Sequence, residues 1–221
     1  KLYEYDRNIV KHTKEINERR EEKITWKYYQ YLALLFTEIY LDRYFSDKQC
    51  LLDDINTFLV HDFNQRTETW HDMPMFTEDN LNKVAFWAAT GSGKTLMMHV
   101  NIKQYLHYAE KHNAKKLNRI MILTPNEGLS KQHIEELYKS NFDAQLFSKQ
   151  SRGGFFEGQT IDVIDINKRA EQDGDKTVAV DSFEGNNLVL VDEGHKGSGG
   201  EVWTGYRNKL AQEGFSFEYS A

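Results

Sequence analysis

Five short runs of apolar residues follow one another between residue 84 and the end of the chain. They read VAFW (84–87), RIMILT (119–124), IDVIDI (161–166), NLVLVDE (187–193) and FSFEYS (215–220). Each run is almost continuously apolar, and helical patterns separate several of them. Strands of this composition are buried on both faces, which is typical of a parallel sheet covered by helices. The pattern predicts an α/β fold with a mostly parallel sheet, and it places ligands at the carboxyl ends of the strands.

A helical pattern precedes the strands. Nine of the thirteen residues 11–23 are charged, with both signs mixed, and this predicts the solvated face of a helix. Thr25 is the expected N-cap of a second helix, whose apolar positions have the spacing of three and four residues: Tyr28, Leu32, Leu35 and Ile39. We expect this second helix to be largely buried.

The residues between this helix and the first strand give weaker signals. A short helical run, LLDDINTFL, is followed by polar residues and by a further N-cap candidate, Thr77. We interpret residues 47–83 as an irregular connection. The expected organisation is therefore a charged helical segment (1–25), a second helix with its connection (26–83) and an α/β lobe (84–221).

The first apolar run leads directly into a glycine-containing loop. Residues 88–95 read AATGSGKT, and the helical run TLMMHVNIKQYLHYA begins at the last of them. A strand, a loop of small residues and a helix form the context of a phosphate-binding loop, in which backbone N–H groups and the helix N-terminus face phosphate oxygens. The alternative is a Gly-Lys-Thr string that caps a helix by chance.

This loop predicts a site for ATP. The expected nucleotide contacts are Ala89, Thr90, Gly91, Ser92, Gly93, Lys94 and Thr95. Lys94 would meet the β- and γ-phosphates, and the Thr95 hydroxyl would ligate Mg²⁺.

Two adjacent carboxylates end the fourth apolar run. Asp192 and Glu193 would be costly at the end of a central strand unless a cation or a water molecule used them. We expect Asp192 to hold Mg²⁺ and Glu193 to orient and deprotonate the attacking water. The alternative is a polar strand end that runs into a loop. The catalytic interpretation requires Lys94 and Glu193, distant in the sequence, to meet at one triphosphate site.

The composition of the chain restricts how it could bind nucleic acid and in which compartment we expect it. The formal net charge is −6 and the pI is about 5.8, so contacts to nucleic acid would be local rather than driven by bulk charge. Cys50 is the single cysteine, which excludes an internal disulfide framework and favours a reducing, cytoplasmic setting. Because no apolar stretch approaches the roughly 20 residues needed to span a bilayer, we expect no membrane segment.

Both motifs resemble those of a known enzyme superfamily. A-x-T-G-S-G-K-T (88–95) and Asp-Glu-Gly-His (192–195) resemble the phosphate loop and the DExH box of superfamily 2 helicases and translocases. The resemblance implies a RecA-like lobe in which His195 links the state of ATP to domain closure. A surface histidine in a loop is the alternative. Ser220 and the alanine after it resemble the start of the Ser-Ala-Thr motif. The resemblance implies that Ser220, like His195, links the state of ATP to domain closure.

Two further segments carry the same resemblance. KYYQYLA (27–33) resembles a signature in which a glutamine, here Gln30, reads the adenine edge, although Lys27 stands where arginine is usual. A buried helix glutamine is the alternative. LTPNEGLSKQHIEEL (123–137) resembles a segment that contacts the nucleic-acid backbone. The expected contacts there are Thr124, Pro125 and Asn126.

Taken together, residues 26–221 resemble the Res subunit of type III restriction enzymes and related phage-defence helicases. That resemblance implies ATP hydrolysis coupled to movement on nucleic acid, with DNA favoured over RNA. It also implies a second RecA-like lobe and a nuclease or modification subunit as partners. Two rival functions remain open: a P-loop kinase or NTPase acting on a small acceptor, and a non-catalytic module that senses ATP.

Overall fold

The computed structural model describes residues 1–63, 66, 75–147, 160–165, 185–193 and 209–221. Within these residues six strands form one sheet, in the order β1-β6-β5-β2-β4-β3, and every neighbouring pair is parallel. The strands are β1 (Lys83–Trp87), β2 (Arg119–Thr124), β3 (Ala144–Leu146), β4 (Ile161–Asp165), β5 (Asn187–Asp192) and β6 (Phe215–Ser220). The α/β class and the parallel sheet predicted from the sequence are confirmed.

The predicted strands coincide with five of the six observed ones. All six residues of β5 are buried, and successive side chains enter two different apolar clusters on the two faces of the sheet. Leu188 and Leu190 join the larger cluster, whereas Val189 and Val191 join the smaller one. Burial on both faces explains why the strand shows no alternation of apolar and polar residues.

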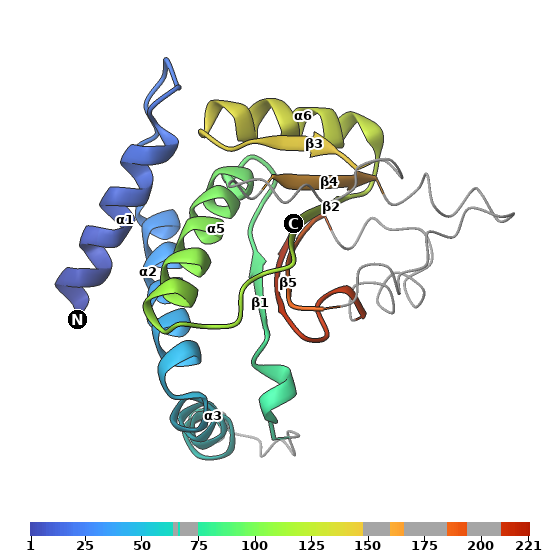
Figure 1. The fold of residues 1–221 in the computed structure, drawn as a ribbon. Coiled ribbons are helices and arrows are strands. Elements are labelled where there is room, and N and C mark those ends of the chain that lie inside the picture. Colours follow the sequence, from blue (N-terminus) through green and yellow to red (C-terminus); the bar gives the residue numbers. More distant parts are fainter. Residues whose placement is uncertain (64–65, 67–74, 148–159, 166–184, 194–208) are drawn as a thin grey trace, which may run out of the picture.

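The helices that the structure describes pack mainly on the face of the larger cluster. They are α1 (Leu2–Ile16), α2 (Tyr28–Ser46), α3 (Lys48–Thr57), α5 (Lys94–Lys111) and α6 (Glu127–Lys139), with short turns η1 (Phe58–Phe63) and η2 (Glu78–Asn80). Figure 1 shows α1, α2 and α5 side by side, and α6 next to β3 and β4. In the described part of the chain, no helix has the length and apolar character needed to cross a membrane.

The start of α2 differs from expectation. Its N-cap is Lys27, not Thr25, because the Gln30 side chain folds back and its Oε1 accepts a hydrogen bond of 2.8 Å from the Lys27 backbone N–H. Tyr28 is 79% exposed, and the buried positions include the polar residues Glu38 and Asp42. Most positions of α2 are nevertheless buried or half-buried, as expected, and its inner face is partly polar because it meets polar side chains of α1 and α5.

The charged segment near the N-terminus is only partly helical. The helix α1 ends at Ile16, so residues 17–23 lie beyond it.

Thr77, the other expected N-cap, caps the single turn η2. Its N–H and hydroxyl both donate to Asn80 Oδ1.

A buried polar network joins α1, α2 and α5. Glu38 accepts hydrogen bonds from Tyr108 Oη (2.6 Å), Gln104 Nε2 (2.8 Å) and Asn8 Nδ2 (3.1 Å). Burial raises the pKa of the Glu38 carboxyl, while its three donors act in the opposite direction. His12 lies in the same interface, and burial lowers the pKa of its imidazole to about 4.

Acid is expected to lower the free energy of unfolding because His12 in this interface becomes protonated. The folded-state pKa of about 4 lies below the ordinary histidine value of 6.5, so the stability contributed by neutral His12 is complete above pH 6.5. It is lost progressively as the pH falls from 6.5 towards 4. Because one pKa unit corresponds to about 1.4 kcal/mol, the loss is on the order of 3 kcal/mol.

Urea unfolding at several pH values between these limits measures the effect. A His12→Leu variant cannot titrate at this position, so its free energy of unfolding should fall less steeply with acid than that of the unaltered protein. The environment of His99, whose pKa shift comes from burial, His133 and Arg20, is the same in both proteins. Equal slopes for the two proteins would contradict the assignment to His12.

Candidate functional site

The sheet brings the glycine loop and the acidic strand end to the same edge. In the strand order, β6 lies between β1 and β5. The backbone N–H of Ala88, at the start of the loop, donates to Ser220 O (3.0 Å), and the N–H of Glu193 donates to Tyr219 O (2.9 Å). Both segments are therefore tied to the carboxyl end of β6.

Lys94 and Glu193 meet at this edge. The Lys94 Nζ lies 3.7 Å from Glu193 Oε1, and the two side chains are 7% and 11% exposed. The same Nζ donates to Ala88 O (2.8 Å) and Ala89 O (3.3 Å), so the ammonium group lies inside the curve of its own loop. The convergence that the sequence interpretation requires is present in the structure.

The loop has the backbone geometry of an anion site. Gly91 and Gly93 have φ of +77° and +85°, in the left-handed region that glycine adopts without strain. Gly93 is the N-cap of α5 and offers no side-chain cap, which leaves the first N–H groups of the helix for another acceptor. Ala89, Thr90 and Gly91 are exposed, as contacts to a ligand require.

The N-terminal part of α2 packs directly on this loop. Gln30 Nε2 donates to Ser92 O at 2.7 Å, and Tyr29 Oη donates to the same oxygen at 3.1 Å. A Cβ added at Gly93 would lie 2.5 Å from Gln30 Nε2, so glycine is needed for this close approach. The structure thus brings Gln30, expected to read adenine, into contact with the phosphate loop.

The residues at this edge suit a triphosphate with Mg²⁺. Ser92 Oγ is buried and has no hydrogen-bond partner among the described residues, so a polar ligand would satisfy it. No group of three or more His, Cys, Asp or Glu in the described ranges forms a metal site by itself. Mg²⁺ held by Thr95 and Asp192 would therefore depend on phosphate and water oxygens as well, which is its usual coordination.

Asp192 has a partner that the sequence interpretation missed. His133, on α6, places Nε2 at 2.8 Å from Asp192 Oδ2, and both side chains are buried. His133 is 2% exposed, and it lies four residues before the fully buried Leu137. Its helical spacing from Leu137 predicts only an inward-facing position, so the pattern gave no reason to assign it a role.

The residues expected to contact nucleic acid run from the end of β2 to the N-cap of α6. The Thr124 hydroxyl is buried and lies 2.6 Å from Ser130 Oγ, and Pro125 is buried too. Asn126 is exposed and caps α6, accepting a hydrogen bond from the Leu129 N–H at 2.9 Å. Asn126 is therefore the member of this group that faces solvent. His195 lies outside the described residues.

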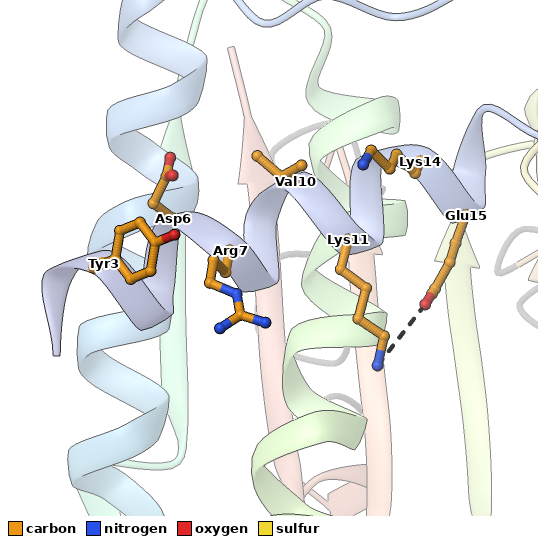
Figure 2. Close-up of a pocket in the computed structure, with 7 residues that line it drawn as sticks. All are labelled: Tyr3, Asp6, Arg7, Val10, Lys11, Lys14 and Glu15. Carbon is orange, nitrogen blue, oxygen red and sulfur yellow. Dashed lines mark ion pairs between the residues drawn. The ribbon is translucent and has the colours of Figure 1, made fainter.

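A separate cavity of about 450 Å³ lies on the outer surface of α1 (Figure 2). Its lining is Tyr3, Asp6, Arg7, Val10, Lys11, Lys14 and Glu15. All of these residues belong to one helix, and Lys11 Nζ lies 4.0 Å from Glu15 Oε1, so acids offset part of the basic charge. This hollow is distinct from the edge where Lys94 and Glu193 meet.

A comparison with protein families gives a match that covers most of the chain. The family described as type III restriction enzyme, res subunit, matches residues 23–217. A search of curated proteins gives no match. The matched range contains Gln30, the glycine loop, Lys94, Asp192 and Glu193, whereas α1 lies before it and Tyr219 and Ser220 lie after it.

Proposed function

Since the chain belongs to the family of type III restriction enzyme res subunits, we propose that its helicase-like lobe hydrolyses ATP with Mg²⁺ to move on or remodel DNA. We place this activity in a restriction or phage-defence system of the cytoplasm. The observation that supports the proposal most directly is the pair of Lys94 and Glu193, 7% and 11% exposed, beside a glycine loop whose helix has no side-chain N-cap.

The residues at the sheet edge divide the chemistry among them. The backbone of residues 89–93 and the Lys94 ammonium would hold the phosphates, and Gln30 would contact the adenine. Glu193 would orient a water molecule and accept its proton. Asp192 and Thr95 would hold Mg²⁺, which supplies charge neutralisation on the phosphates when it is bound. His195 and Ser220 would link these events to the movement of a second lobe.

Contacts to nucleic acid are expected at the start of α6. Asn126 is exposed there, and the N–H groups of the first helical turn can donate to phosphate without reading bases. A net charge of −6 requires such contacts to be local. The proposed partners are DNA, a second RecA-like lobe that contributes arginine, and a nuclease or modification subunit.

Duplex DNA is expected to raise ATP turnover by the full-length protein by about 10-fold or more, because an arginine supplied by a second lobe is worth orders of magnitude in rate. Phosphate release should be measured with duplex DNA, single-stranded DNA and RNA at equal nucleotide concentration. Heparin serves as the control for unspecific polyanion effects. Transfer of the γ-phosphoryl group to a small acceptor, without stimulation by any polymer, would favour a kinase instead. Binding of ATP without turnover would favour a sensing module.

A further inference from the structure

Two buried histidines, one on α5 and one on α6, lie near Asp192. His99 and His133 are 0% and 2% exposed. Each uses one ring nitrogen: His133 Nε2 lies 2.8 Å from Asp192 Oδ2, and His99 Nδ1 lies 2.8 Å from Ser140 Oγ. The other nitrogens, His133 Nδ1 and His99 Nε2, are buried and have no hydrogen-bond partner among the described residues. Buried polar atoms of this kind are rare and call for an explanation.

Ser140, the partner of His99, also contacts an arginine from the segment that follows α1. Arg20 Nη2 donates to Ser140 Oγ at 2.7 Å, and also to Glu136 O (3.2 Å) and Glu136 Oε2 (3.0 Å) at the end of α6. The Arg20 side chain is 10% exposed. Arg20 precedes the residues 23–217 that match the family, so it anchors α6 from outside the matched region.

Along the bonds from Arg20 through Ser140 to His99, each group donates a proton to the next. A guanidinium group only donates, so the Ser140 hydroxyl accepts from Arg20 and its own proton is left for His99 Nδ1. Neutral His99 then carries its proton on Nε2. Burial lowers the pKa of His99 well below its usual value, which keeps the ring neutral. A nearby His133 charge would act in the same direction, as expected for neighbouring rings.

His133 donates to Asp192. The carboxylate only accepts, so the proton of this hydrogen bond lies on His133 Nε2. The bond joins α6, which carries His133, to the end of β5, which carries Asp192.

We propose that His133 positions Asp192 for Mg²⁺, and that the hydrogen bonds from Arg20 to Glu136 and through Ser140 to His99 hold the end of α6, the helix that carries His133. This inference rests on the proposed function, because it takes Asp192 as the residue that holds Mg²⁺. With Oδ2 fixed by His133, the carboxylate presents Oδ1 in one orientation. Partners of this kind commonly change metal affinity by about 10- to 100-fold when they are removed.

The test measures how strongly Mg²⁺ supports nucleotide binding in the full-length protein. A fluorescent ATP analogue is titrated in EDTA and at several Mg²⁺ concentrations, and steady-state ATP turnover is recorded beside it. In His133→Leu, the Mg²⁺ concentration for half-maximal binding should rise by about 10-fold or more. Affinity in EDTA should stay within about 2-fold, because Lys94 and the loop are untouched. Arg20→Met should give a smaller rise in the same direction.

Conservative variants separate positioning from simple support of the fold. The amide nitrogen of His133→Gln reaches the place of Nε2 and should restore most of the Mg²⁺ response, whereas the shorter His133→Asn should behave like His133→Leu. The comparison of Gln with Asn decides the question even if the leucine variant fails to fold. His107→Gln, on the α1 side of α5, is the matched control and should bind like the unaltered protein.

Two results would overturn the inference. One is a Mg²⁺ requirement that is the same in His133→Asn and His133→Gln. The other is an equal loss of affinity with and without Mg²⁺ in both variants, which indicates structural damage alone. If the unaltered protein binds ATP with no dependence on Mg²⁺, the proposed function fails first and this inference fails with it.

Discussion

Replacing Glu193 with glutamine is expected to lower ATP turnover by about 100-fold or more and to leave ATP binding within a few-fold of the unaltered protein. Glutamine has nearly the same shape, so it keeps the contacts of the side chain near Lys94. It has no basic carboxylate, however, and cannot accept the proton of the attacking water. Phosphate release at saturating ATP and duplex DNA measures turnover, and a fluorescent ATP analogue measures binding.

Glu213→Gln is the matched control for this substitution. Glu213 lies on the surface in an exposed ion pair with Lys115, so the same chemical change there should alter neither turnover nor binding. Turnover by Glu193→Gln within about 3-fold of the unaltered protein would remove Glu193 from the catalytic role proposed here, since losing a general base costs at least about 100-fold. The assignment of the loop to nucleotide binding would survive that result.

The backbone at Glu193 explains how the carboxylate reaches Lys94. β5 ends at Asp192, and Glu193 has φ of +53°, in the left-handed region that non-glycine residues adopt at some cost. Its N–H is fixed by Tyr219 O. The chain therefore turns at the strand end while Asp192 keeps the strand geometry, so two adjacent carboxylates reach different neighbours. Asp192 meets His133, and Glu193 meets Lys94.

The strands could be predicted from the sequence because burial on both faces leaves a simple signal. Apolar runs at 119–124, 187–193 and 215–220 are observed as strands within one residue. The strand β3 was missed, since three residues with two exposed side chains carry too little pattern. The start of α2 was misplaced because a side-chain contact, from Gln30 to Lys27, decided it rather than a capping residue type.

The site could be predicted in part for a topological reason. All strands of a parallel sheet end at the same edge, so the loop after β1 and the acids at the end of β5 lie on that edge, with β6 between them. The polar groups behind that edge could not be predicted. His99, His133 and Arg20 come from three segments, and each alone resembles an ordinary helix or loop residue. Only the folded chain brings them together, with His99 and Arg20 both meeting Ser140 at the end of α6.

Replacing Lys94 with alanine is expected to weaken ATP binding by about 10- to 100-fold, because hydrogen bonds to charged groups contribute about 1.5 to 3 kcal/mol. The ammonium group is the one cation that the described contacts place within the curve of the loop. Its loss removes the charge that would neutralise the β- and γ-phosphates. Titration with a fluorescent ATP analogue measures the affinity. Lys115→Ala, which changes an exposed lysine on the surface, is the control and should bind as the unaltered protein does.

A second variant separates lost binding from lost stability. Without Lys94, the Glu193 carboxylate, which is 11% exposed, loses its ion pair with that lysine, so Lys94→Ala should also unfold at lower urea. Removing the negative charge as well, in Lys94→Ala with Glu193→Gln, should recover most of that stability without restoring affinity for ATP. Recovery of ATP affinity together with stability would contradict a direct contact between Lys94 and the phosphates. It would show instead that Lys94 acts by keeping Glu193 and the loop folded.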